Sequence, residues 1–388
     1  MKKVNPHIIQ WAIDWNGLTI GELEKAFPKI RQWLDGSHEP TFKQLEKLAA
    51  KTHTLVPYFT MQAIPDVSLQ IADFRKANPG DATAPSPELF DTIDELLFKQ
   101  AWLRDYFVEV GADKLEWVGA FAHQAAMPDV DAIADYLHEL LDLEEGWASQ
   151  SGISSTDEAW RTLRQAIEKQ RVAVCISGYA GTNTRRTLKV SEFRGFALSD
   201  EYAPFIFVNG ADAKTAQLFT LVHEMAHILF FQTGVSRPIE PHKPFGGEDE
   251  TERFCDQISA EFLLPRSPFL GIWADTKDKE AALKQSTKEF KVSTIVVLRR
   301  ALDLQLLTKQ EFGILYDRHC KDRDLIKADK PSGGDYYRSQ GTKLGTVLTD
   351  AIYTALKTGY LQFADAYKMT GFKSQNLDRF YRERGMVL

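Results

Sequence analysis

The pentapeptide His223-Glu224-Met225-Ala226-His227 lies in an apolar segment, Leu218 to Phe231, that has the periodicity of a helix. Residues four apart lie on one face of a helix, so both imidazoles can bind the same metal ion. Glu224 is one step further round, where its carboxylate can reach a water molecule bound to that metal. Two neutral histidines, an open position for water and a carboxylate base make up a zinc hydrolase site. The segment predicts a Zn²⁺ site with His223 and His227 as ligands and Glu224 as the catalytic residue.

A five-residue pattern with two unspecified positions also arises by chance on an exposed helix face. The flanking residues argue against this, because they are all apolar and predict a largely buried helix: Leu221, Val222, Ile228, Leu229, Phe230 and Phe231. Two histidines and a glutamate in a buried helix are costly unless partners satisfy them. Burial therefore favours a functional site over a coincidence.

A third ligand is expected in a second helical stretch, which begins near Glu252 and ends before Pro265. Glu252 and Asp256 are four residues apart and share a face, as in a thermolysin-like arrangement. We expect Glu252 to complete a His₂Glu site and Asp256 to hold the distal N–H of His223. The alternative is that Glu252 belongs to an acidic surface turn with residues 248–250, favoured by the helix dipole.

This succession of motifs resembles the ImmA/IrrE family of metallopeptidases, from the Asp212–His227 helix through Glu252-x-x-Cys255-Asp256 to Glu261–Pro265. The resemblance covers most of the chain, from about Val4 onward. It implies a gluzincin-like peptidase coupled to regulation, in several members with an N-terminal helix-turn-helix and in some with cleavage of a partner repressor.

Two positions of the second helix depart from the family pattern, which often has Ala and Asn there. We expect Cys255 to lie behind the ligands and to be inert, and Asp256 to remain able to orient a histidine. The metzincin class is excluded, because it requires a glycine and a histidine where this chain has Phe230 and Thr233.

Composition limits the remaining possibilities. A chain of 388 residues is long enough for two or three domains, and no run of eighteen apolar residues or signal-peptide core is present. Three widely separated cysteines, which cannot all pair, fit a reducing cytoplasm best. The net charge of −7 argues against nucleic-acid binding by the whole surface, but residues 1–60 carry eight Lys/Arg and six Asp/Glu, which leaves −9 for the remainder.

The N-terminal sixty residues read as short helices, with expected bounds Pro6–Trp15, Thr19–Phe27, Lys29–Leu34 and Phe42–Thr52. They resemble a Cro/repressor-type (XRE) helix-turn-helix, whose recognition helix enters the major groove of DNA. The resemblance implies that Lys29, Arg31 and Gln32 face DNA. The alternative is a helical bundle that binds only protein.

The rest of the chain predicts an α+β fold that is mostly helical, with a small sheet before the metal-binding helix. Expected helices are Ser86–Val110, Val130–Leu143, Thr156–Gln170, 278–302 and 308–324, and expected strands are Val172–Ser177, Glu192–Leu198 and Phe205–Val208. An edge strand of such a sheet can hold an extended peptide over the metal.

We therefore expect four parts: a helix-turn-helix domain at 1–60, a linker and helical packing region at 61–150, a zincin-like metallopeptidase domain at 151–330 and a helical C-terminal region at 331–388. The C-terminal region is either a second helix-turn-helix or a partner-docking bundle.

Several polar residues stay open in role. The loop Gly178–Arg186 is either a substrate-side loop or a plain hairpin connection, and His242 in a later loop is most simply a solvated side chain. Arg194 and Tyr202 are candidates to stabilise an oxyanion, although such residues more often serve packing.

Two functions fit this organisation. The first is a regulatory zinc-dependent endopeptidase that cleaves or controls a repressor or toxin partner. The second is a DNA-binding regulator or antitoxin that holds a toxin, with the metal site structural or inactive. Both involve a protein partner and DNA but no membrane, and both are compatible with a homodimer.

Overall fold

The computed structural model describes residues 3–65, 85–122, 128–150, 152–236, 250–276, 278–326, 336–372 and 374–388. The chain forms two compact units, Met1–Asp94 and Glu95–Leu388. Helix α5, Pro87–Glu109, crosses the boundary between them. The division into four functional parts stays a prediction.

The first unit is built from short helices around an apolar core. Their bounds are Pro6–Trp15 for α1, Ile20–Glu24 for α2, Ile30–Leu34 for α3, Phe42–Lys51 for α4 and Val56–Thr60 for the 3₁₀ helix η1. Thr19 and Thr41 begin α2 and α4 with reciprocal capping boxes, which fix where these helices start. Ile8, Trp33 and Phe59 are among the side chains buried between the helices. The helices expected in residues 1–60 are therefore confirmed, with ends shifted by a few residues.

The second unit contains a four-stranded sheet in its described residues, with the strand order β1-β3-β2-β4. The strands are Ala173–Ser177 (β1), Gly195–Leu198 (β2), Phe205–Asn209 (β3) and Gly234–Ser236 (β4). β1 is parallel to β3, whereas β2 is antiparallel to β3 and to β4. The three expected strands are confirmed, and the short β4 was not anticipated. Its three residues are too few to show an alternating pattern.

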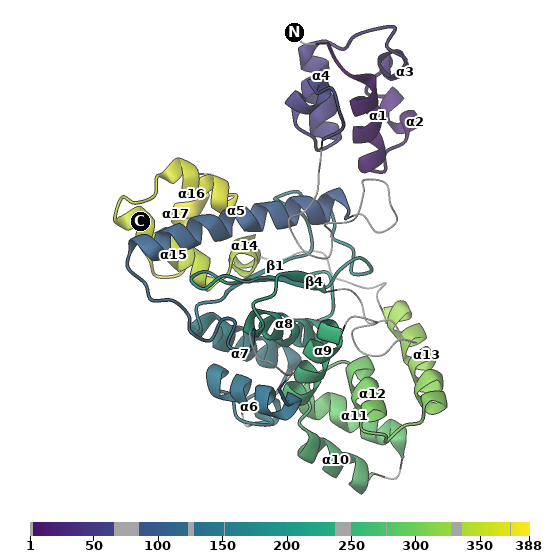
Figure 1. Ribbon diagram of the computed structural model, residues 1–388, viewed down its shortest axis with the longest axis vertical. Helices are drawn as coiled ribbons and strands as arrows, with labels where there is room; N and C mark the ends of the chain where they lie inside the picture. Colours follow the sequence, from purple (N-terminus) through teal and green to yellow (C-terminus); the bar gives the residue numbers. More distant parts are fainter. Residues whose placement is uncertain are drawn as a thin grey trace. The chain divides into compact units, whose positions relative to one another are not determined.

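Helix α8, Lys214–Leu229, is the central helix of this unit (Figure 1). It packs against β2 and β3 on one side and against α7, Thr156–Lys169, and α9, Glu250–Leu263, on others. Helix α6, Val130–Leu141, packs in turn against α9. Every residue of α8 from Ala216 to Leu229 is buried. The expected burial of the helix that carries both histidines is therefore confirmed.

Beyond α9 the chain continues as α10 (Arg266–Asp275), α11 (Lys279–Phe290), α12 (Thr294–Asp303) and α13 (Lys309–Ile326). The sequence predicted one helical stretch over 278–302, and the structure divides it in two. Lys291 ends α11 with a left-handed φ of 58°. Ser293 then begins α12, and its side chain accepts a hydrogen bond from the backbone N–H of Val296. The N-cap at Ser293 lies inside a stretch with continuous helical periodicity, which is why the sequence predicted one helix instead of two.

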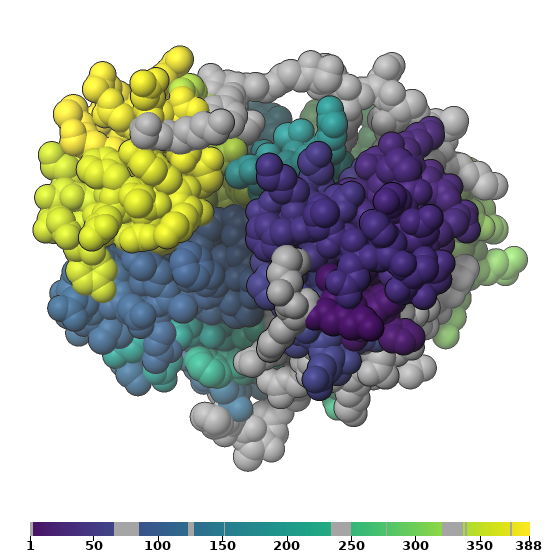
Figure 2. Space-filling view, turned by 90° about the horizontal axis from the view of Figure 1, so that it is seen from above, coloured from purple at the N-terminus to yellow at the C-terminus, as the bar shows by residue number. Residues whose placement is uncertain are grey.

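The C-terminal helices are α14 (Tyr336–Leu344), α15 (Thr346–Lys357), α16 (Phe363–Thr370) and α17 (Ser374–Arg382). In Figure 2 they form the yellow group beside the blue α5. The ring centroids of Tyr106 on α5 and of Tyr360, between α15 and α16, lie 5.3 Å apart. Helices α14 and α15 both pack on β1. These helices therefore belong to the same compact unit as the sheet.

The outer edge of β1 is covered by these helices. Gly345, with φ of 78°, joins α14 to α15 so close to β1 that a Cβ atom there would lie 2.7 Å from the carbonyl oxygen of Val174. That carbonyl accepts a hydrogen bond from Arg164 Nη2 at 3.1 Å. A free edge strand exposes unpaired backbone groups, and here a guanidinium occupies one of them. β1 is therefore closed to a further strand.

Candidate metal centre

The last turn of α8 is held by a neighbouring segment of backbone. The N–H groups of Gly119 and Phe121 donate to the carbonyl oxygens of Ile228 and Leu229, both at 3.0 Å. These carbonyls belong to the end of the helix, where backbone acceptors lack partners within the helix itself. The segment thus fixes the turn that carries His227.

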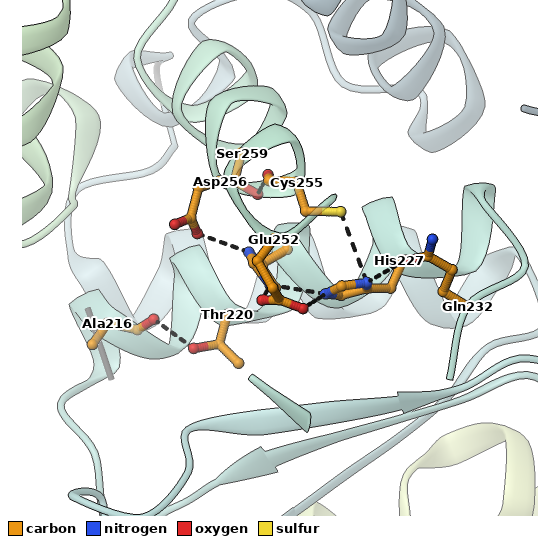
Figure 3. A network of polar contacts seen from close by, with 9 residues as sticks. Ala216, Thr220, His227, Gln232, Glu252, Cys255, Asp256 and Ser259 are labelled. Atoms are coloured by element: carbon orange, nitrogen blue, oxygen red, sulfur yellow. Dashed lines mark hydrogen bonds and ion pairs between the residues drawn. The ribbon is translucent and has the colours of Figure 1, made fainter. Parts of the chain in front are cut away.

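The structure brings together the three residues that the sequence proposed as ligands. His223 Nε2 and His227 Nε2 lie 3.0 Å apart, and the carboxylate oxygens of Glu252 lie 3.2 Å from the first and 3.1 Å from the second (Figure 3). The histidines come from α8 and the glutamate from α9. One ligand atom from each residue lies within 4.8 Å of the others, a grouping that can hold a metal ion.

The chemistry of this donor set fits a divalent cation. Burial would lower the pKa of His223, but the carboxylates of Asp256 and Glu252 hold it well above its usual value. Burial would likewise raise the pKa of Glu252, and its hydrogen bonds to both histidines lower it instead. Two imidazole nitrogens and one carboxylate oxygen form the ligand set of His₂Glu zinc sites. Because metal ligands must be deprotonated, a cation held here would compete with protons for these groups.

A second layer of side chains contacts the outer nitrogens of the imidazoles. Asp256 Oδ1 lies 2.9 Å from His223 Nδ1, which leaves Nε2 of that ring to face Glu252. Outer partners of this kind fix the tautomer and direction of a metal-binding histidine. The sequence paired Asp256 with His223, and the structure places them in contact.

Gln232 is a residue that the sequence analysis missed. Its Oε1 lies 3.3 Å from His227 Nδ1, and Cys255 Sγ lies 3.8 Å from the same nitrogen (Figure 3). Phe231, with a left-handed φ of 55°, turns the chain back so that the N–H of Gln232 donates to the carbonyl of His227. The only sequence signal for Gln232 was its position as a polar residue directly after the apolar helix segment. Cys255 does lie behind the ligands, as expected.

Glu224 is fully buried and lies against β2. A Cβ atom on Gly195 of β2 would lie 2.5 Å from Thr220 Cγ2 and 3.0 Å from Glu224 Oε1. Only glycine fits where the strand passes this close beneath the helix. Gly195 therefore makes room for the Glu224 carboxylate, a second contribution that the sequence did not reveal.

The other candidates lie elsewhere or outside the described residues. Arg194 Nη1 is 3.6 Å from Asp212, which precedes α8, and Tyr202 packs under the cations of Arg104 and Lys114. His242 and residues 248–249 fall outside the described residues. Neither Arg194 nor Tyr202 is brought to the cluster by these contacts.

The loop Gly178–Arg186 has the features of a hairpin connection. Tyr179 forms an antiparallel bridge with Thr187, and the N–H of Ala180 donates to the carbonyl of Arg186 at 2.9 Å. Lys343 of α14 donates to the carbonyl of Gly181. The loop is thus tied to the C-terminal helices.

The side chains expected to face DNA lie on the surface of the first unit. Lys29, Arg31 and Gln32 are all exposed, while Ile30 and Trp33 of the same short helix are buried. Lys29 Nζ lies 3.3 Å from His38 Nε2, and Arg31 forms an ion pair with Glu24. Their role in DNA binding stays a prediction.

Comparison with known proteins supports the family resemblance. Residues 168–302 match the family model described as the IrrE N-terminal-like domain (Peptidase_M78). The matched segment contains β1, β2, β3, α8 and α9, and hence all three residues of the cluster. The match supports the ImmA/IrrE family and a metallopeptidase-like regulatory role. No curated protein and no solved structure matches the chain.

The described residues contain no candidate membrane-spanning helix. None of the helices there combines the length and the apolar character needed to cross a membrane.

Proposed function

We propose that this protein is a regulatory zinc-dependent endopeptidase fused to a helix-turn-helix domain, and that it cleaves or controls a repressor or another partner protein. The convergence of His223, His227 and Glu252 from two helices, beside the buried Glu224, is the observation that supports it. The family match over residues 168–302 supports the same class of chemistry.

The chain's own residues divide the work of peptide hydrolysis. A Zn²⁺ ion held at this site would supply Lewis-acid polarisation of the substrate carbonyl and would lower the pKa of a bound water to about 7. His223, His227 and Glu252 hold the metal, while Asp256 and Gln232 orient the two imidazoles. Glu224 takes the proton of the attacking water and passes it to the leaving amine.

Metal analysis of the purified protein, combined with a cleavage assay, tests this proposal. The substrate is the product of the neighbouring gene, incubated with wild-type protein, Glu224→Gln and His223→Ala. We expect Glu224→Gln to keep its zinc and to lose about 10²–10⁴-fold in cleavage rate, since the proton transfer is lost. His223→Ala loses the metal itself.

Glu289→Gln, an exposed position on α11, is the matched control and keeps wild-type activity. Zinc bound by His223→Ala at wild-type stoichiometry counts against the site. Cleavage by Glu224→Gln at the wild-type rate counts against the assigned base.

A second candidate function rests on the first unit. The exposed side chains of Lys29, which precedes α3, and of Arg31 and Gln32 on α3 suit a DNA-binding regulator or antitoxin that holds a toxin, with the metal site structural or inactive. A neighbouring gene for a small toxin favours this function. Full control of the partner by Glu224→Gln in cells supports it over proteolysis, because holding a partner does not require the base.

A further inference from the structure

A cavity of about 650 Å³ lies within the second unit, beside the covered edge of β1. Its lining residues come from α7, from the first residue of α8, from α14 and α15, and from α17 and the turn after it. Figure 1 shows where these helices lie. Lys214, the residue of α8 that lines it, precedes His223 by nine positions, which is about 14 Å along a helix. The cavity is therefore separate from the metal centre.

Charged side chains dominate the cavity wall. Four are basic, namely Arg161, Arg164, Lys214 and Arg384, and three are acidic, namely Asp157, Glu168 and Glu383. Two of the acids already have partners. Glu168 accepts from Arg164 at 3.3 Å and from the N–H of Thr346 at 2.8 Å, and Glu383 accepts from Arg379, which does not line the cavity. Asp157, the third acid, acts electrostatically on Lys214. The wall thus carries four basic side chains against three acidic ones, one of which, Glu383, is paired outside the cavity.

Lys214 is a half-buried cation held on an aromatic face. Its Nζ lies 3.4 Å from the centroid of the Trp160 ring and 3.2 Å from Gln217 Oε1. No carboxylate oxygen of the described residues lies within 4.0 Å of it, and Asp157 acts on it only from a greater distance. Burial lowers the pKa of Lys214 to about 8. An ammonium group has three donors, and an anion in the cavity can accept from those that Gln217 leaves.

Arg384, an exposed residue in the turn after α17, also lines the cavity and lies on an aromatic ring. Its guanidinium carbon lies 3.9 Å from the centroid of the Phe380 ring. Gly341 leaves room for this group, because a side chain at that position would collide with the guanidinium. Within the described chain, no carboxylate oxygen lies within 4.0 Å of the Arg384 guanidinium, and Asp350 and Glu168 act on it only from a greater distance. Two cations on two aromatic rings therefore face one cavity from elements far apart in sequence.

We propose that this cavity binds a small organic oxyanion, a phosphate or carboxylate compound about the size of a mononucleotide, through Lys214 and Arg384. Guanidinium groups bind oxyanions with two parallel hydrogen bonds, and ammonium groups bind them as point charges. The volume is in the range of small-molecule sites and exceeds what a bare inorganic ion fills. Because Lys214 begins α8, the ligand contacts the helix that also carries His223 and His227.

Thermal unfolding and titration calorimetry of the full-length protein test this proposal without any cleavage assay. The probes are adenosine 5′-monophosphate and citrate, with adenosine as the neutral control and inorganic phosphate as the bare ion, each at about 10 mM. A ligand that binds only the folded state raises Tm. We expect one of the two organic anions to raise Tm and to bind with a saturable isotherm, and adenosine to leave Tm unchanged.

Two variants locate the binding. Lys214→Gln and Arg384→Gln each weaken binding of the organic anion by at least about tenfold, since each removes a charged donor. Arg382→Gln, two residues before Arg384 at the end of α17, is the matched control, because its side chain is 67% exposed and pairs with Asp378 outside the cavity. Circular dichroism and zinc content verify that each variant folds.

Three results would overturn the proposal: no Tm shift with either organic anion, wild-type affinity in both cavity variants, or inorganic phosphate binding as tightly as the organic anions. None of these depends on peptidase activity. Failure here is therefore distinguishable from failure of the proposed function.

Discussion

Helix α8 carries ionisable side chains at both ends, and the two ends are built differently. Toward its C-terminus, His223 and His227 converge with a carboxylate, and further side chains of the chain orient both rings. At its first residue, Lys214 lies on an aromatic ring beside a cavity, without an ion-pair partner among the described residues. Ligand atoms that converge on one point, as at the C-terminal end of α8, are suited to binding a single metal ion. A cationic side chain that borders a cavity, as Lys214 does, is suited to binding a negatively charged ligand.

The largest loss of zinc affinity is expected from Glu252, because it is the only ligand that α9 contributes to the cluster. Glu252→Ala removes one of three ligand atoms, so it should weaken zinc binding by more than about 100-fold, the upper range for outer partners. Competition against a chelator, with metal content measured afterwards, gives this ratio. Glu250→Ala is the matched control, because Glu250 is exposed in the same first turn of α9. Equal zinc affinity in the two variants would remove Glu252 from the site.

A smaller loss is expected from the side chains behind the ligands. Asp256→Ala should weaken zinc binding by about 10- to 100-fold, because His223 loses the acceptor that fixes its tautomer. Asp256→Asn should recover most of that loss, since its amide oxygen can still accept from Nδ1. Gln232→Ala should cost less than Asp256→Ala, because a neutral amide at 3.3 Å binds the ring more weakly. The same chelator competition ranks all three, and a larger loss for Gln232→Ala would reverse the assignment.

The close approach of β2 to α8 predicts an effect on stability. Gly195→Ala places a Cβ atom 2.5 Å from Thr220 Cγ2 and 2.7 Å from the carbonyl oxygen of Phe207, so strand and helix must separate. Overpacking of this kind costs about 1–3 kcal/mol in the free energy of unfolding. Urea denaturation measures it, with Gly271→Ala in α10 as control because nothing lies within 4 Å of the added atom. A loss below about 0.5 kcal/mol would mean that the contact relaxes freely.

The difference between the two ends of α8 also explains which residues could be predicted from the sequence. The histidines and Glu252 were found because each helix carries its residues at a spacing of four, which local periodicity alone decides. Gln232 was missed because its position depends on the left-handed turn at Phe231.

The cavity could not be predicted, since Trp160, Lys214 and Arg384 come together only through tertiary packing, of α7 against α8 and of α14 and α15 on β1. The need for glycine at Gly195 likewise depends on a distance between helix and strand that no local pattern encodes. The site defined by spacing was therefore accessible from sequence, and the one defined by tertiary packing was not.

The smallest effect is expected in the pH dependence of stability that arises from the titration of Lys214. Burial lowers its pKa from 10.5 to about 8 in the folded protein, so between these values the unfolded chain binds more protons than the folded one. The free energy of unfolding contributed by this group therefore rises with pH across that window. Partial exposure screens the effect to about 1–2 kcal/mol.

Urea denaturation of wild-type protein and Lys214→Gln at pH 7 and pH 10, in buffer free of phosphate and citrate, isolates this contribution. Subtracting the variant removes the titration of every other group, so wild-type protein should gain stability relative to the variant as the pH rises. A difference that is constant over this range would show that Lys214 is solvated like a surface lysine. The cavity would then lack the unneutralised, half-buried charge that distinguishes this end of α8 from the metal centre.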